Sequence, residues 1–460
     1  MEVGIISIAI PLLTIMLAII TKDVIVSLMG GIFAGLLVLN GYNPLTAFVA
    51  LFDGIIALFS EGWIAKTLFF SLMIGALMHL LTASGAIRSF LAWLSQKAER
   101  IDSPRGAMLL AYIVGVTIFI ESSITSLVAG TLARPLCDKH NVSREKLAYI
   151  CDSTSAPVCS LIPLNAWGAL LLGLILTAIE SHVVGGDAVS LLIASIPFNF
   201  YAIITLVIVL FVILSNKDIG PMKHTVPHPY KEEINTSKIQ KKTPFPMVLP
   251  LLVIVLAIPV SLYITGDGDI FKGSGSTSVY YAIIVTLFFM YFYYVPTGLL
   301  THKGYFKHFY EGLAEMLPVV TILLFALFIG KVIGDLGTAK YLASLLDGNV
   351  TAMYVPVLIF LVASITAFST GTSWGTFSIM MPIGLALAGS MELHIPLVIA
   401  AVISGGIFGD HASPISDTTI ISSIASGCEP VEHIRTQLPY ALIAGVLASL
   451  SFIFAGWIYA

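Results

Sequence analysis

The chain has 460 residues, of which 57% are hydrophobic and only 10% are charged, and its formal net charge is −4. Soluble domains carry about 25% charged residues, so this composition excludes a soluble fold, and the negative charge gives no reason to expect nucleic acid as a partner. The four cysteines show no metal-ligand spacing. The sequence contains no zinc motif, nucleotide-binding loop or nucleophile elbow, so we expect neither an enzyme nor a cofactor.

Apolar segments that could cross a bilayer begin close to the start of the chain. A spanning helix needs about 20 apolar residues, and this length predicts spans in the first half at 3–20, 24–39, 64–83, 147–180 and 191–214. The region 106–136 is too long for one helix, and the polar residues Glu121, Ser122 and Ser123 interrupt it. Two arms of about 15 residues each rise only about 22 Å. We therefore expect a re-entrant helical hairpin at about 106–136.

The second half repeats this order after a polar linker at 216–245. Its predicted spans, the last of them a terminal transmembrane helix, are 246–265, 278–296, 317–336, 396–427 and 438–460. An amphipathic stretch at 300–315 precedes the third of these spans. A second interrupted apolar region, about 351–389, has small polar residues at its centre, where the chain reads Thr370, Gly371, Thr372 and Ser373. We expect a second re-entrant hairpin there.

The placement of Lys and Arg predicts the orientation of the chain. Cytoplasmic loops carry an excess of these residues, and the linker 216–245 is rich in lysine, so we expect it in the cytoplasm. Counting crossings from the linker places the basic flanks of the first hairpin on the same side, whereas the second hairpin opens to the outside. All but four of the 22 Lys and Arg residues then lie inside. The exceptions are Lys66, Lys272, Lys331 and Lys340.

The two halves match in order and are predicted to be inverted repeats. The first repeat covers 1–215 and the second 246–437, and each has a hairpin followed by a broken helix, at about 141–180 and 396–427. The first repeat makes five predicted crossings, so the second starts from the opposite side. Inverted repeats with discontinuous helices are typical of secondary transporters and place the site near the midplane. The predicted fold class is an all-α polytopic membrane protein.

The most informative motif interrupts the span 396–427 and reads GGIFGDHASPISDTT from Gly405 to Thr419. Pro414 breaks the helical hydrogen-bond ladder, and we expect the glycines to permit unusual dihedral angles. Ionisable groups inside a membrane are functional candidates, although a hydrogen-bonded structural kink is the alternative. For His411 we favour a structural role. The candidate ion or substrate ligands of this motif are Asp410, Ser413, Ser416, Asp417 and Thr418.

The equivalent segment of the first half also combines a carboxylate, hydroxyls and prolines. Carboxylate, hydroxyl and freed carbonyl oxygens suit Na⁺, and two nearby carboxylates can share a proton. We therefore expect Na⁺ at Asp410, Asp417 or Asp152. The ends of half-helices at the hairpin tips expose backbone groups that bind ions or carboxylates. The candidates outside the second-half motif are Asp152, Ser153, Thr154, Ser155, Asn165, Glu121, Ser122, Ser123, Thr370, Gly371, Thr372 and Ser373.

Three further polar residues lie within predicted spans. Lys331 and Asp335 are four residues apart and share one helix face, so they are expected either to pair or to leave Asp335 in the cation path. His79 lies near the matching position of the first half. No role can be assigned to His79 from the sequence.

The strings GDHASPISDTT, which ends at Thr419, and STGTSWGT, which begins at Ser369, resemble the NhaC family of Na⁺/H⁺ antiporters. The two-hairpin inverted architecture is similar to the wider ion-transporter superfamily, which contains Na⁺/dicarboxylate symporters. The resemblance covers nearly the whole chain. It implies a homodimer in the lipid bilayer of a bacterial inner membrane, whose scaffold holds two transport domains that move as elevators. The motif residues and both hairpin tips would lie in the transport core.

Two functions follow from these expectations and stay open at this point. The first is Na⁺/H⁺ exchange, which needs a carboxylate that binds Na⁺ and H⁺ in turn. The second is Na⁺- or H⁺-coupled transport of a small organic solute, an amino acid or organic acid, because members of this family are also linked to such solutes. In that case the hairpin tips and Asn165 or Trp167 would contact the solute. A channel is disfavoured, since hairpins that stop midway favour alternating access.

Overall fold

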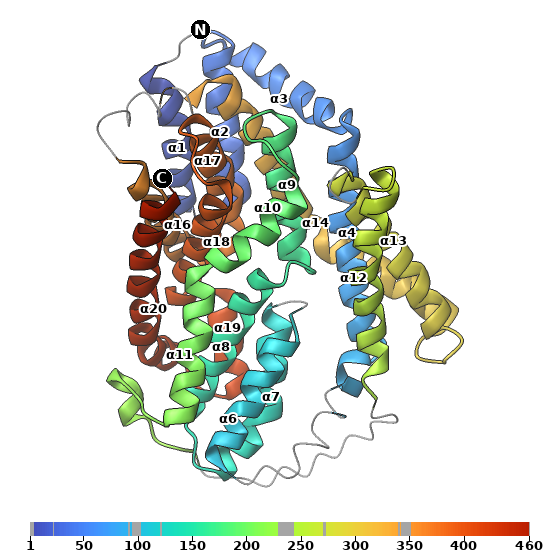
Figure 1. Ribbon diagram of the computed structural model, residues 1–460, viewed down its shortest axis with the longest axis vertical. Helices are drawn as coiled ribbons and strands as arrows, with labels where there is room; N and C mark the ends of the chain where they lie inside the picture. Colours follow the sequence, from blue (N-terminus) through green and yellow to red (C-terminus); the bar gives the residue numbers. More distant parts are fainter. Residues whose placement is uncertain are drawn as a thin grey trace.

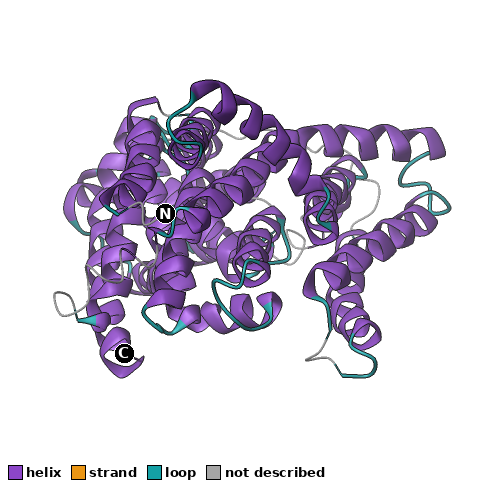
Figure 2. Cartoon of the chain, turned by 90° about the horizontal axis from the view of Figure 1, so that it is seen from above, coloured by secondary structure: helices purple, strands orange, loops and turns teal. Residues whose placement is uncertain are grey.

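The structure, a computed structural model, describes residues 4–459 except 22, 91–92, 94–102, 120–121, 229–242, 270–272, 339–340 and 342–350. Within these residues every regular element is a helix and no strand is present (Figures 1 and 2). Nine helical segments of this part are long and apolar enough to cross a membrane. The predicted all-α, multi-pass fold is therefore confirmed for the described residues.

Helix starts in the first half follow from capping side chains. Asp23 accepts a hydrogen bond from Val26 N, and Ser103 and Ser143 accept bonds from the third residue after them, which satisfies backbone donors that a helix leaves unpaired. The elements of this half are α1 (Ile5–Thr21), α2 (Val24–Leu39), α3 (Pro44–Phe59), α4 (Gly62–Ala83), α6 (Pro104–Thr117), α7 (Ser122–Lys139), α8 (Arg144–Leu161), α9 (Ala166–Glu180), α10 (Ala188–Ser195), η1 (Ile196–Phe198), α11 (Phe200–Ser215) and η2 (Gly220–His224).

The second half contains the longest helices of the described chain. The polar linker predicted at 216–245 lies mainly outside the described residues, at 229–242. The elements that follow it are α12 (Phe245–Thr265), α13 (Gly275–Tyr294), α14 (His302–Asp335), η4 (Ala352–Tyr354), α16 (Val355–Thr370), α17 (Ser373–Ser390), α18 (Ile395–Ala412), α19 (Asp417–Ser426) and α20 (Pro430–Tyr459).

Two segments differ from their predicted form. The predicted span 191–214 is divided into α10, η1 and α11, because Pro197 lies in the 3₁₀ turn and cannot donate to a helical ladder. In contrast, the predicted amphipathic stretch and third span of the second half form one helix, α14, of 34 residues. Thr301 caps its start by accepting from Gly304 N, and Pro318 lies inside the helix.

The helix pairs α6–α7 and α16–α17 lie in opposite halves of the molecule. Figure 1 shows α6 and α7 in the lower half and α16 and α17 in the upper half. The interrupted helices α8–α9 and α18–α19 pack against these pairs. α18 is the most enclosed of the candidate spans, with 89% of its residues buried, so protein rather than lipid surrounds its polar C-terminal turn.

A smaller group of helices lies to one side of the interrupted helices, and its member α4 packs on α9. α4, α12 and α13 lie together on the right of Figure 1. α14 packs on α4 and also on α2, α9 and α17. This long helix therefore connects the smaller group with the core.

Candidate functional site

The turn between α16 and α17 lies against the interruption between α18 and α19. Gly371 ends α16 with a φ of 68°, which glycine adopts without strain. A Cβ added at Gly371 would lie 2.9 Å from Ile415 O, so only glycine permits this approach. Ser413 Oγ donates to Phe368 O at 2.8 Å, which fastens the interruption to the end of α16.

Asp410, in the last turn of α18, is the buried carboxylate of this junction. Its exposed fraction is 1%. Ser373 Oγ, at the start of α17, donates to Asp410 Oδ2 at 3.0 Å. Within the described residues Asp410 Oδ1 has no hydrogen-bond partner. A buried carboxylate oxygen without a partner is costly, so this position is suited to a proton or a cation.

Three further motif residues lie at the start of α19. Ser416 Oγ and Thr418 Oγ1 are 3.1 Å apart and both side chains are buried. Asp417 Oδ1 accepts from Thr418 N at 2.8 Å, and Asp417 is exposed. The structure therefore brings two aspartates to one interruption and gives them opposite environments, Asp410 enclosed and Asp417 open.

Asp152, on α8, is the second buried carboxylate, with an exposed fraction of 0%. Its Oδ2 accepts from Gln437 Nε2 at 2.7 Å and from Thr419 Oγ1 at 3.3 Å, and His433 Nε2 lies 3.3 Å away. Its Oδ1 has no partner among the described residues. One oxygen of Asp152 is thus held by α19 and α20, while the other stays available.

His411 connects the two carboxylates. Its Nε2 lies 3.1 Å from Ser153 Oγ, and its Nδ1 lies 2.6 Å from Tyr201 OH on α11. Its carbonyl oxygen accepts from Gln437 Nε2 at 2.8 Å. Both ring nitrogens have partners, as expected for a structural residue, but these contacts also tie the residue after Asp410 to the helix that bears Asp152.

Asn165 plays the corresponding part in the first half. Its Nδ2 lies 2.8 to 2.9 Å from the carbonyl oxygens of Phe119, Cys159 and Ile162, and its Oδ1 accepts from Gly168 N. The bond to Phe119 O joins the end of α6 to the interruption between α8 and α9. In both halves, a side chain at the interruption therefore donates to a phenylalanine carbonyl beside the hairpin turn. The Asn165 amide is committed to the backbone.

The remaining predicted residues differ in what they contact. Thr154 Oγ1, Ser155 Oγ and Thr370 Oγ1 donate to carbonyls of their own helices. Thr372 is half-buried and its carbonyl oxygen accepts from Thr376 Oγ1. The hydroxyls of Thr154, Ser155 and Thr370 therefore satisfy backbone carbonyls of their own helices. Of the first hairpin's predicted residues, Ser122 is buried, Ser123 is half-buried and Glu121 lies outside the described residues.

The glycines of the motif do not have the predicted role. Gly405, Gly406 and Gly409 stay within the regular helix α18. A Cβ would lie 2.4 Å from Phe360 O at Gly405 and 2.1 Å from Ser364 O at Gly409. Gly405 and Gly409 are needed because the backbones of α16 and α18 touch, whereas a Cβ at Gly406 would lie 2.4 Å from the Phe377 ring of α17. None of the three has an unusual dihedral angle.

Sequence reasoning missed the contributions of α11 and α20. His433 and Gln437 lie one turn apart on α20 and are fully buried, but the terminal span was predicted to begin only at residue 438. The available signal was that these two polar residues lie four positions apart, directly before the predicted apolar span. Tyr201 follows Phe200 in a strongly apolar helix, and nothing in its sequence context indicates a partner.

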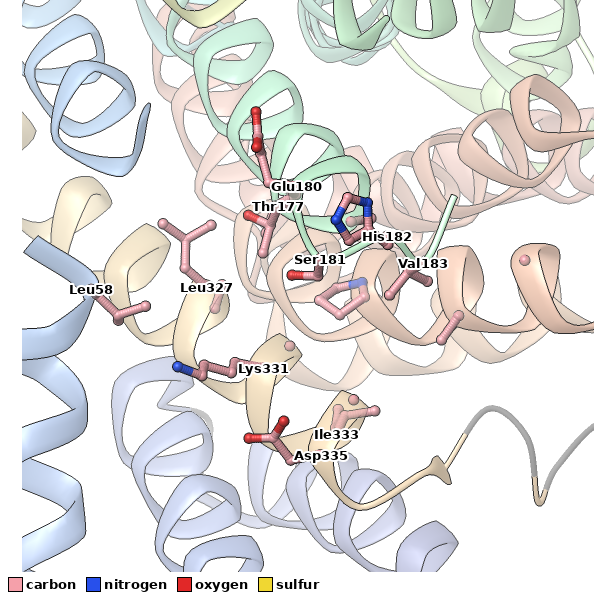
Figure 3. A pocket seen from close by; sticks show the side chains of 18 of the residues that line it. Leu58, Thr177, Glu180, Ser181, His182, Val183, Leu327, Lys331, Ile333 and Asp335 are labelled. Carbon is pink, nitrogen blue, oxygen red and sulfur yellow. The ribbon is translucent and has the colours of Figure 1, made fainter. Parts of the chain in front are cut away.

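A separate pocket of about 980 Å³ lies between α4, α14, α9 and α17. Figure 3 shows Lys331 and Asp335 on one helix beside this space and Glu180 on another. His182 and Glu61 also line it. In the described part of the chain, Lys331 and Asp335 do not form the ion pair that their spacing allowed. Both charged side chains instead line the pocket.

Comparison with known proteins agrees with this architecture. A family model described as the Na⁺/H⁺ antiporter family matches residues 158–457. An uncharacterized protein of Haemophilus influenzae is 36% identical over 474 residues, covering 97% of this chain and 90% of that protein. The malate-2H⁺/Na⁺-lactate antiporter of Bacillus subtilis is 34% identical over 99 residues, or 22% of this chain and 21% of that protein.

The fold itself is shared with a solved transporter. The structure of Neisseria gonorrhoeae MtrF, described as illuminating a class of antimetabolite efflux pumps, superposes with a TM-score of 0.60 at 14% identity, covering 90% of this chain and 85% of that one. A chain whose described residues form a multi-pass helical fold and that matches this family model is a membrane transporter. It belongs to the Na⁺/H⁺ antiporter family, whose model spans more than half of it. The resemblance carried by the motif is thereby confirmed.

Proposed function

We propose that this transporter exchanges Na⁺ for H⁺ at Asp410. The observation that carries the proposal is the state of that carboxylate, which is 1% exposed, bonded to Ser373 through Oδ2, and without a partner at Oδ1 among the described residues. In an enclosed site a carboxylate is stable when it holds either a proton or a cation. Alternation between these two ligands is the chemistry that exchange requires.

The oxygens around Asp410 support Na⁺ as the cation. Ser416 places a buried hydroxyl at the same interruption, and carbonyls at the end of α18 lose their helical partners there. Carboxylate, hydroxyl and unwound carbonyl oxygens form the kind of set that coordinates Na⁺ at broken helices. Asp417 is exposed at the same interruption, and we assign it the first contact with an entering ion. Asp152, whose Oδ1 has no hydrogen-bond partner among the described residues, is the candidate for a second cation.

We further propose that the chain consists of inverted repeats and works as an elevator in a homodimer. The placement of α6–α7 and α16–α17 in opposite halves supports the inversion (Figure 1). The matching bonds of Asn165 to Phe119 O and of Ser413 to Phe368 O support equivalent interruptions. In this proposal both hairpins with α8–α9 and α18–α19 form the transport domain, and the residues of the 216–245 linker lie in the cytoplasm of a bacterium.

The second candidate function is coupled transport of a small organic acid or amino acid. The pocket of about 980 Å³ favours it, because a bare cation needs no such space and Lys331 and His182 could face a carboxylate. The Bacillus subtilis relative is described as an antiporter of malate with protons against lactate with Na⁺. In this reading Asp410 holds the coupling ion, and the solute enters through the pocket.

Proteoliposomes separate the two functions. The purified protein is reconstituted with an internal pH dye, and an inward Na⁺ gradient is imposed without any organic solute. Internal alkalinisation driven by Na⁺ alone is the result expected for exchange, because each Na⁺ that enters drives H⁺ out of the vesicle. Absence of proton movement, followed by Na⁺ flux that starts only on addition of malate, lactate or an amino acid, would overturn exchange and establish the second function.

A further inference from the structure

A compact group of metal-binding side chains lies where α4 crosses α14, away from the site at Asp410. His79 comes from α4, and His308 and Glu311 lie three residues apart on one face of α14. One ligand atom from each of the three lies within 4.8 Å of the others. All three side chains are only partly buried, so the group is not closed off by protein.

The crossing of the two helices fixes this group. A Cβ at Gly75 would lie 2.4 Å from Gly312 O, and a Cβ at Gly312 would lie 2.4 Å from Gly75 O. The two backbones are therefore in contact, with His79 one turn after Gly75 on α4 and the other two ligands in the turn that precedes Gly312 on α14. Backbone contact of this kind positions side chains more precisely than a loop does.

The distances suit a single ion. His79 Nε2 lies 3.2 Å and His308 Nδ1 lies 2.7 Å from the same oxygen, Glu311 Oε2. A tetrahedral Zn²⁺ with bonds of about 2.1 Å holds its ligand atoms roughly 3.4 Å apart. Small side-chain rotations would open the group to that spacing. Two imidazoles and one carboxylate, with water in the fourth position, form a known zinc ligand set.

Glu315 supplies the support that a metal-binding histidine needs. Its Oε1 lies 2.9 Å from His79 Nδ1, the ring nitrogen that faces away from Glu311. A histidine that binds a metal through one nitrogen almost always donates the other N–H to a carboxylate or carbonyl, which fixes the ring and its tautomer. Lys307 Nζ lies 3.8 Å from the other oxygen of Glu311, Oε1, and leaves Oε2 to the histidines.

We propose that His79, His308 and Glu311 bind one divalent transition-metal ion of the Zn²⁺ type, with Glu315 orienting His79. Such an ion fastens α4 to α14 at one end of their crossing. The same helix, α14, lines the pocket of about 980 Å³ with Lys331 and Asp335. The ion would therefore fix the position of a helix that packs both on α4 and on α2, α9 and α17. The site needs none of the residues assigned to ion exchange.

Metal binding to the purified full-length protein tests the proposal directly. After chelator treatment and desalting, we expect about one Zn²⁺ per chain by elemental analysis, and a rise in melting temperature with Zn²⁺, because a ligand that binds only the folded state stabilises it. Co²⁺ should give the intense visible absorption of a four-coordinate site. Absence of stoichiometric Zn²⁺ binding to the wild-type protein would overturn the proposal.

Variants locate the ion. His79→Ala and His308→Ala should each abolish the Zn²⁺-dependent rise in melting temperature, and Glu315→Gln should weaken Zn²⁺ binding by about tenfold or more. The matched control is His302→Ala, since His302 lies on α14 and contacts Tyr291 instead. Unchanged Zn²⁺ affinity in Glu311→Gln and His79→Ala, or an equal loss in His302→Ala, would show that this group does not bind the ion.

Discussion

The Gln437 amide donates to Asp152 Oδ2 across the contact of α20 with α8, at 2.7 Å. The same nitrogen lies 2.8 Å from the carbonyl oxygen of His411. One fully buried side chain therefore holds a carboxylate of the first half and the helix end that bears Asp410 in the second half. Neither interrupted helix can shift relative to the other without breaking a bond to Gln437.

Gln437→Leu removes this donor at nearly constant volume. We expect the free energy of unfolding to fall by about 1–3 kcal/mol, because Asp152 Oδ2 and the His411 carbonyl lose a partner in an enclosed site. Thermal unfolding in detergent, followed by circular dichroism, measures the effect. Arg435→Ala is the control, as its exposed side chain lies two residues away, and a surface change there should stay within about 0.5 kcal/mol. Equal losses in both variants would contradict the role of Gln437.

Asp410→Asn tests the proposed exchange site. Na⁺-driven proton movement should fall to background, because an amide cannot alternate between Na⁺ and H⁺. The Na⁺-dependent stabilisation should also disappear; for one site it amounts to about 2.7 kcal/mol when Na⁺ is 100 times the Kd. Asp53→Asn, on the exposed face of α3, should change neither. Exchange at the wild-type rate in Asp410→Asn would remove this carboxylate from the mechanism.

Tyr201→Phe isolates the bond to His411. The hydroxyl lies 2.6 Å from His411 Nδ1 and both residues are buried, so the variant leaves a ring nitrogen without a partner and should cost about 1–3 kcal/mol of stability. We also expect slower exchange, since His411 adjoins Asp410. Melting temperature and initial transport rate are the two measurements. The exposed Tyr310→Phe serves as the reference, and an equally mild effect in both would speak against the bond.

Gly409→Ala tests the close contact of α16 and α18. An added Cβ would lie 2.1 Å from Ser364 O, and overpacking of this kind costs about 1–3 kcal/mol or more. The matched control is Gly334→Ala on α14, where a Cβ meets nothing within 4 Å and helix propensity predicts a gain of about 0.5–1 kcal/mol. The two variants should thus shift the melting temperature in opposite directions. A gain in Gly409→Ala would show that the helices separate easily.

The sequence alone located the interruptions because proline and clustered small polar residues mark them. Pro414 and Pro163 lie at the interruptions, whereas Pro157 stays inside α8, and composition could not tell which proline would end the helix. That choice depends on tertiary bonds, in particular from Asn165 to Phe119 O.

The partners of the carboxylates were largely beyond sequence reasoning. Asp152 and Asp410 could be selected because charge is costly inside a membrane. Gln437 lies 285 residues after Asp152 in the chain, and no local pattern relates the two. The role of Gly405 and Gly409 was also misjudged, since the need for glycine comes from the neighbouring helix and not from the local dihedral angles.

The contact between α16 and α18 has a mechanical consequence. At Gly405 and Gly409 the two backbones touch without intervening side chains, and Ser413 adds a bond to Phe368 O. Because the two helices are in direct backbone contact and share this hydrogen bond, α16 cannot move away from α18 on its own. A passage to Asp410 on this side would open by displacement of both helices as one lever, or by movement of the α17 arm that carries Ser373.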